Sequence, residues 1–202
     1  LRHVKDEDDL YVSLVSEWPD PAGMVVDGFM PPTLLDDRSR WPTLGDPVSR
    51  MMALDGLTYL PDDILVKVDR ASMAVSLETR APFLDRDVIE FAWSLPMSMK
   101  LRDGKGKWLL RRLVDRHVPG ALMDRPKMGF GIPLDQWLRG PLREWAEALL
   151  DESRLIREGY LDPKPIRAAW LRHQRGEASF GYRLWSVLMF QAWLEHEGKP
   201  ET

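Results

Sequence analysis

Apolar residues recur every three or four positions along most of the chain, which is the spacing of an amphipathic helix. In one clear example, Ile64, Leu65, Val68, Ala71 and Val75 share one face. Patterns that alternate as a strand does are scarce, and 23–26 is the main candidate. The spacing predicts helices over about 6–18, 47–59, 62–75, 86–95, 107–118, 141–149, 163–175 and 179–196.

Signals at the helix ends support this pattern. Acidic residues follow Asp6 at the start of the first predicted helix, where the helix dipole favours negative charge. Asp85 is placed as the N-cap of the helix over 86–95, and Pro141 suits the first turn of the helix over 141–149. The proline-rich segment between Pro19 and Pro47 is typical of a long ordered loop or linker. We therefore expect a predominantly α-helical fold, with any parallel sheet of the protein lying outside this stretch.

Composition narrows the class of protein. A chain of 202 residues suits one domain or one large piece of a longer protein, and its start at Leu1 favours a piece. The 28 basic and 32 acidic residues form no basic stripe, which argues against nucleic acid as a partner. The chain has no cysteine, which excludes thiolate chemistry and fits a cytoplasmic protein. No apolar run reaches the roughly 18 residues that a membrane span needs.

The face of the 62–75 helix opposite its apolar side is charged. At about 100° per residue, Asp63, Lys67 and Arg70 project together, and Asp62 and Asp69 lie on the adjoining strip. One interpretation is a solvated face with weak ion pairs. The other is a mixed-charge wall that holds a zwitterionic substrate, with carboxylates for its ammonium group and bases for its carboxylate.

A second charged pair follows this helix. Ala81 precedes Pro82 and is therefore pushed toward extended backbone. If 77–82 is extended, Glu78 and Arg80 point to the same side. Such a pair is either a buried structural ion pair or a substrate contact, and the pattern favours neither.

The third candidate is the loop over 124–133, which carries Arg125 and Lys127 among prolines and glycines. Two cations in such a loop suit phosphate or pyrophosphate oxygens, although a basic turn in water is an equal alternative. Other signals are weaker. The segment 103–108 lacks the spacing of a phosphate-binding P-loop, and the four histidines show no zinc-binding spacing.

Four stretches together resemble a known family. In chain order they are LPDDILVKVDRASMAVSLETRAPFLD, GKGKWLLRRLV, DRPKMGFGIPLDQWLRGPLREW and YRLWSVLMFQAWLE. They are similar to the C-terminal part of glutamine-hydrolysing asparagine synthetases over about 51–195. The resemblance implies the helical C-terminal portion of an α/β synthetase domain of the adenine-nucleotide α-hydrolase type, with its parallel sheet largely outside this fragment. Residues 47–202 would form this portion, and 1–46, a helix and a proline-rich loop, match only loosely.

The resemblance also implies a reaction. Members of this family use ATP with Mg²⁺ to adenylate the side chain of aspartate, release pyrophosphate, and let glutamine-derived ammonia displace AMP to give asparagine. By this resemblance, Lys127 matches a loop lysine that stabilises pyrophosphate as negative charge moves onto it. Arg125 shares its loop, and the block that borders the aspartate and adenylate pocket contains Asp63, Lys67, Asp69, Arg70, Glu78 and Arg80.

Several parts of such an enzyme lie outside this sequence. It contains no Ser-Gly-Gly-x-Asp-Ser pyrophosphate loop, no Ser-Gly-Glu-Gly-x-Asp-Glu segment and no cysteine for a glutaminase. We expect that the fragment alone cannot make asparagine, that it holds no metal by itself, and that its partners are these missing segments and a second copy in a homodimer. Two alternatives stay open: a related amidotransferase of surface-polysaccharide or peptide biosynthesis, and a non-catalytic helical interaction module.

Overall fold

The computed structural model describes residues 4–123 and 131–197. Most of these residues are helical, and the one sheet among them has two short strands. The expected predominantly α-helical fold is therefore confirmed. The chain divides into two compact units, residues 1–33 with 128–202, and residues 34–127. No helix in the described part of the chain is long and apolar enough to cross a membrane.

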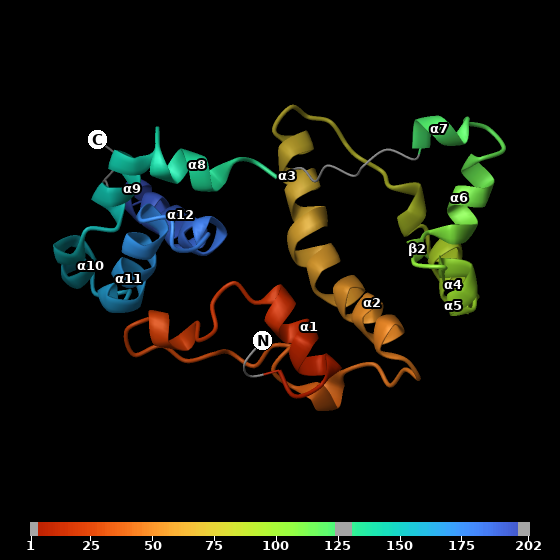
Figure 1. The fold of residues 1–202 in the computed structure, drawn as a ribbon, viewed down its shortest axis with the longest axis horizontal. Helices are drawn as coiled ribbons and strands as arrows, with labels where there is room; N and C mark the ends of the chain where they lie inside the picture. The colour runs from red at the N-terminus through yellow and green to blue at the C-terminus, as the bar shows by residue number, and fades with distance from the viewer. Residues whose placement is uncertain (1–3, 124–130, 198–202) are drawn as a thin grey trace. The chain divides into compact units, whose positions relative to one another are not determined.

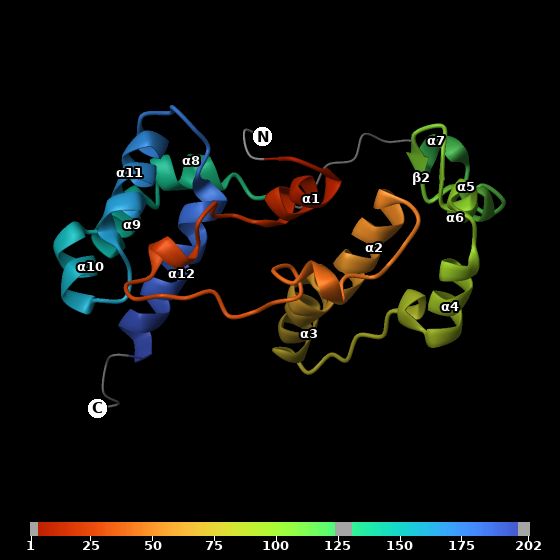
Figure 2. The ribbon, with the colours of Figure 1, turned by 90° about the horizontal axis from the view of Figure 1, so that it is seen from below.

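Unit 1 contains the buried core. Its elements are α1 (Glu7–Val15), the 3₁₀ turn η1 (Ala22–Met24), α8 (Leu134–Arg139), α9 (Arg143–Leu149), α10 (Glu152–Glu158), α11 (Pro163–Gln174) and α12 (Gly181–Glu197). The helices α8–α12, teal to blue in Figures 1 and 2, surround side chains that are at most 2% exposed. Among these are Leu138, Leu149, Leu155, Trp170, Leu184 and Leu188.

The N-terminal segment completes this core. Met24 is 6% exposed and packs into the same cluster. Its carbonyl accepts a hydrogen bond of 2.9 Å from the Asp162 N–H, and Val25 forms an isolated antiparallel bridge with Leu161. The predicted strand over 23–26 is therefore wrong in form, because Gly23 and Met24 belong to the 3₁₀ turn. The two residues that follow pair only locally: Val25 lies in the isolated bridge, and the Val26 N–H donates to the Tyr160 carbonyl at 3.0 Å.

Unit 2 is built from shorter elements. They are η2 (Arg38–Arg40), α2 (Pro47–Leu57), the π-helix η3 (Leu60–Leu65), α3 (Val66–Met73), η4 (Pro82–Leu84), α4 (Arg86–Ser94), α5 (Met97–Lys100), β1 (Leu101–Arg102), β2 (Lys105–Gly106), α6 (Trp108–Val114) and α7 (Gly120–Met123). Asp85 caps α4 as expected, because its side chain accepts the N–H of Asp87 at 3.0 Å.

Three features of the described residues differ from the sequence-based expectations. The helices α8 and α10, of six and seven residues, were not among the predicted elements. Pro141 precedes α9 instead of opening its first turn. The segment 101–106 forms a hairpin whose turn, Asp103-Gly104, has φ angles of 51° and 72°. Two positive φ values are typical of the type I′ turn, which an Asp-Gly pair favours.

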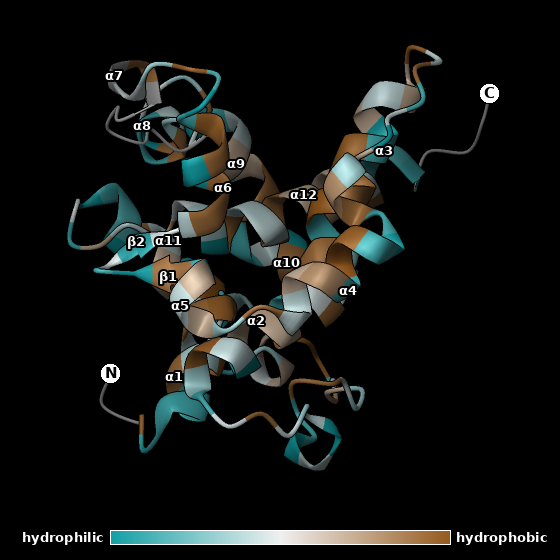
Figure 3. Ribbon diagram, turned by 90° about the vertical axis from the view of Figure 1, so that its right-hand side faces the viewer, coloured by the Kyte–Doolittle hydropathy of each residue, from teal (hydrophilic) through white to brown (hydrophobic). Residues whose placement is uncertain are grey.

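Unit 2 buries little apolar surface. Among its described residues, Trp41 and Leu54 are the apolar side chains that are fully buried, at 8% and 0% exposure. The apolar positions that recur along α3 and α4, brown in Figure 3, remain open, with Val68 45% and Phe91 59% exposed. Because monomeric domains rarely leave whole helix faces uncovered, these faces suit contact with further protein.

Candidate functional site

The charged face of η3 and α3 is present as predicted, and its charges are paired with one another. The Lys67 ammonium lies 3.0 Å from an Asp63 carboxylate oxygen, one helical turn earlier. The Arg70 guanidinium pairs with the neighbouring Asp69. The side chains of Lys67 and Arg70 are 66% and 76% exposed, so water screens both pairs and each adds little to stability.

A π-helix lies at the start of this face. Residues 60–65 have the wider i→i+5 turn, and they include Asp62 and Asp63. A π turn costs hydrogen-bond geometry compared with an α-helix, and such turns occur frequently at functional sites. The sequence-based ranges instead place a break between helices at 60–61, where the structure has this π-helix. The interpretation of this face as one wall of a site stays a prediction.

Glu78 and Arg80 also pair, which the same-side arrangement of an extended segment allows. The Arg80 Nε donates to Glu78 Oε1 at 3.0 Å, from a segment without helix or strand between α3 and η4. Their side chains are 69% and 84% exposed. The alternative of a buried structural ion pair is therefore wrong within unit 2. A contact with a bound molecule remains a prediction for this pair.

The third candidate lies elsewhere in the chain. Arg125 and Lys127 fall outside the described residues, so the structure does not place them. No cluster of three or more histidine or acidic side chains that could hold a metal ion occurs among residues 4–123 and 131–197.

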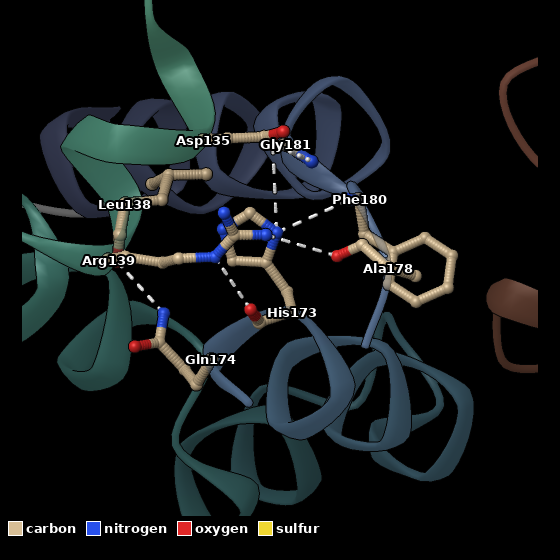
Figure 4. A network of polar contacts seen from close by, with 8 residues as sticks. All are labelled: Asp135, Leu138, Arg139, His173, Gln174, Ala178, Phe180 and Gly181. Atoms are coloured by element: carbon tan, nitrogen blue, oxygen red, sulfur yellow. Dashed lines mark hydrogen bonds and ion pairs between the residues drawn. The ribbon is translucent and has the colours of Figure 1, made fainter. Parts of the chain in front are cut away.

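The structure reveals a polar network that the sequence did not indicate (Figure 4). His173 in α11 is 0% exposed, and its Nδ1 accepts the Phe180 N–H at 3.2 Å. Arg139 of α8 donates to the carbonyls of His173 at 2.8 Å and Ala178 at 3.2 Å. Asp135, also in α8, accepts the Gly181 N–H at 3.0 Å. These bonds join α8 and α11 to the start of α12.

His173 is held in its neutral form. Burial lowers the pKa of His173 below its usual value of 6.5, the Arg139 guanidinium lowers it further, and the Asp135 carboxylate opposes them. Because Nδ1 accepts a hydrogen bond, the proton of the neutral ring is on Nε2, which has no hydrogen-bond partner among the described residues. A second proton would therefore displace the Phe180 N–H from Nδ1.

This network makes the stability of unit 1 depend on pH. As pH falls below about 6.5, an unfolded chain protonates His173 while the folded chain does not, so stability falls until the lowered folded pKa is reached. Because the unfolded and folded chains differ by at most one proton at His173, the free energy of unfolding changes by at most about 1.4 kcal/mol per pH unit. We expect His173→Gln to flatten the dependence between pH 6.5 and 5 in urea unfolding curves.

His196→Gln is the matched control, because this histidine is exposed on α12. It should leave the slope unchanged. Equal slopes for the wild type and His173→Gln would contradict the assignment of a neutral His173 in the folded chain.

Comparison with known proteins identifies the family to which the chain belongs. The sequence matches the asparagine synthase family over residues 1–195, and the chain belongs to that family. A provisionally named glutamine-hydrolysing asparagine synthetase of Mycobacterium tuberculosis is 40% identical over 162 residues, 77% of this chain and 24% of that protein. Asparagine synthetase (glutamine-hydrolysing) 1 of Bacillus subtilis is 33% identical over 158 residues, 76% of this chain and 25% of that protein.

A more distant relative has a different name. The carboxyethyl-arginine beta-lactam-synthase of Streptomyces clavuligerus is 34% identical over 86 residues, 40% of this chain and 16% of that protein. No solved structure matches the chain. The chain spans about a quarter of the length of the two asparagine synthetases. The family match begins at residue 1 and thus includes the segment 1–46, for which the sequence motifs indicated only a loose resemblance.

Proposed function

We propose that the chain is part of an ATP-dependent synthetase that adenylates the side chain of aspartate and transfers glutamine-derived ammonia to it, giving asparagine, AMP and pyrophosphate. The observation that carries this proposal is membership of the asparagine synthase family over residues 1–195. Two relatives named as glutamine-hydrolysing asparagine synthetases, which cover three quarters of the chain, support the choice of aspartate.

The charged wall suits the proposed substrate. Aspartate presents one ammonium and two carboxylate groups, and the wall offers the carboxylates of Asp63 and Asp69 beside the cations Lys67 and Arg70. Since these exposed pairs are weak, a bound zwitterion can replace the internal partners at small cost. Arg80 adds a planar guanidinium, which binds a carboxylate through two parallel hydrogen bonds.

The rest of the catalytic machinery is proposed to lie in other parts of the protein. The exposed apolar faces of α3 and α4 would cover the parallel sheet of the synthetase domain, and Mg²⁺ would be held by ATP and by residues outside the described ones. A cytoplasmic location and a homodimer belong to the same proposal. The relative named as a beta-lactam-synthase favours one alternative, in which the family's helical block serves an acceptor other than aspartate.

Two arginines of unit 2 provide a sharp test. Arg80 and Arg86 both pair with a glutamate on the surface, at 3.0 and 2.7 Å, and their side chains are 84% and 87% exposed. Either arginine should therefore be replaceable without loss of fold. In the full-length protein, we expect Arg80→Ala to lower kcat/KM for aspartate by about tenfold or more, because a charge-assisted hydrogen bond contributes roughly 1.5–3 kcal/mol.

The control variant Arg86→Ala should leave kcat/KM for aspartate unchanged. This value is measured from the rate of aspartate-dependent pyrophosphate release. If both substitutions change kcat/KM for aspartate equally, Arg80 does not contact the substrate. A full-length protein that releases no pyrophosphate with aspartate, but does so with another carboxylic acid, would instead favour the alternative acceptor.

A further inference from the structure

A small cavity in unit 1 is lined by apolar, aromatic and arginine side chains. It measures about 310 Å³ and is walled by the segment before η1, by α11 and by the start of α12. Met24 and Ala169 supply an apolar floor, being 6% and 8% exposed. Trp18, Phe180, Arg172 and Arg183 form the upper walls. The volume lies at the lower end of the range for small-molecule sites, roughly 300–1,000 Å³.

The walls are fixed in place by hydrogen bonds from each segment. The Trp18 indole N–H donates to the Arg183 carbonyl at 3.2 Å, which ties the N-terminal segment to α12. The turn into η1 is closed by the Gly23 N–H, which donates to Asp20 Oδ1 at 3.0 Å. A Cβ at position 23 would lie too close to the other oxygen of Asp20, so a larger residue would push this carboxylate out of its position. The cavity is therefore already formed in the folded chain.

The charge in the cavity comes from two guanidinium groups. Arg183 lies over two aromatic rings, 5.9 Å from the centroid of Trp18 and 5.4 Å from that of Phe180. Arg172 lies 5.1 Å from the same Phe180 ring and 3.6 Å from a Glu177 oxygen. In the described part of the chain, Arg183 has no carboxylate partner. Stacking on two rings orients its planar group while leaving its N–H donors for a bound anion.

These features select one kind of ligand. A guanidinium binds a carboxylate in a bidentate manner, and the apolar floor adds affinity for a hydrocarbon or aromatic body. The Asp20 carboxylate on the cavity wall disfavours ligands with two or more negative charges. We propose that this cavity binds a small monocarboxylate with an apolar body, whose carboxylate pairs with Arg183 and whose body lies on Met24 and Ala169. The proposal does not depend on the reaction that the protein catalyses.

The test uses 4-fluorobenzoate as the probe and follows its ¹⁹F NMR signal in the presence of the full-length protein. We expect saturable binding in the millimolar range that saturating aspartate does not displace. The uncharged analogue 4-fluorobenzyl alcohol should bind at least tenfold more weakly. Arg183→Gln should weaken binding of the benzoate by about tenfold or more, since it removes a charge-assisted pair. Arg175→Gln is the matched control, because Arg175 is an exposed partner of Glu177 that does not line the cavity.

A second variant separates binding from folding, since Arg183 also holds Trp18. Ala168 lies on the cavity wall and is exposed on α11, so Ala168→Phe fills the space without removing a contact. It should abolish binding while the thermal unfolding midpoint stays within about 2 °C of the wild type. Absence of saturable binding, equal binding of the alcohol, or wild-type affinity in both variants would overturn the proposal. A lower midpoint in Arg183→Gln with unchanged benzoate affinity would assign Arg183 to a structural clamp alone, and would also overturn it.

Discussion

Replacing Lys127 by alanine in the full-length protein is expected to slow pyrophosphate release by about 10²–10³-fold, with a smaller change in KM for ATP. Under the proposed function, negative charge moves onto the leaving pyrophosphate as the acyl-adenylate forms. A cation that contacts those oxygens therefore stabilises the transition state more than the bound substrate. Removing it should lower kcat, which initial rates at saturating ATP and aspartate measure directly.

Lys105→Ala is a suitable control, because this exposed lysine lies in the hairpin strand β2. It should release pyrophosphate at the wild-type rate. If Lys127→Ala also keeps the wild-type rate, Lys127 has no part in the site. The Lys127 test measures the rate at saturating substrate, whereas the Arg80 test measures kcat/KM for aspartate. The two experiments therefore test the 124–133 loop and the charged wall separately.

Trp170→Ala is expected to destabilise unit 1 by about 3–5 kcal/mol, the usual cost of truncating a large buried aromatic side chain. Trp170 is 0% exposed and stacks on His173 with ring centroids 6.1 Å apart. Its indole N–H donates to the Glu147 carboxylate, which Arg167 also contacts. Burial raises the pKa of Glu147, but the bonds from Arg167 and Trp170 outweigh it and hold this pKa below 4.5. The substitution thus removes both packing and a bond to a charged group.

Hydrogen exchange gives the clearest measurement, because it reports on α11 and α12 directly. Some amides of these helices exchange only when unit 1 unfolds, and their exchange should become at least 10²-fold faster in the variant. Each factor of ten in this rate corresponds to a loss of roughly 1.4 kcal/mol in the free energy of unfolding. Trp193→Ala serves as the control, since this tryptophan on α12 is 55% exposed. A loss of less than about 1 kcal/mol for Trp170→Ala would contradict the description of a single packed core in unit 1.

Local chemistry was enough to predict the longer helices. The predicted N-cap Asp85 accepts backbone N–H groups, the acidic first turn expected after Asp6 opens α1, and the helix predicted over 163–175 is α11, Pro163–Gln174. These features depend on residues a few positions apart, which a sequence displays directly. The Asp-Gly pair at 103–104 is a local signal too, typical of the hairpin turn that the structure has there, although the hairpin was not among the predicted elements.

The features that the sequence did not predict depend on distant residues. The network around His173 joins groups 34, 39 and 46 positions apart, so no local period could indicate it. The hydrogen bonds of the π-helix at 60–65 span one residue more than those of an α-helix, a difference that hydrophobic spacing over six residues cannot resolve. For the candidate site, the pairing of Asp63 with Lys67 and of Glu78 with Arg80 followed from spacing, whereas their exposure required the structure.

The way unit 1 is assembled has a consequence for the order of folding. The indole of Trp18 finds its hydrogen-bond acceptor 165 residues later, at Arg183. At about 5–20 residues per second, roughly 10–30 s of synthesis separate the two. During that time Met24 and its neighbours have no core to join, while the whole of unit 2 is being made. Closing so large a loop also makes folding slow, so unit 1 is expected to complete its core only after its last helix has been made.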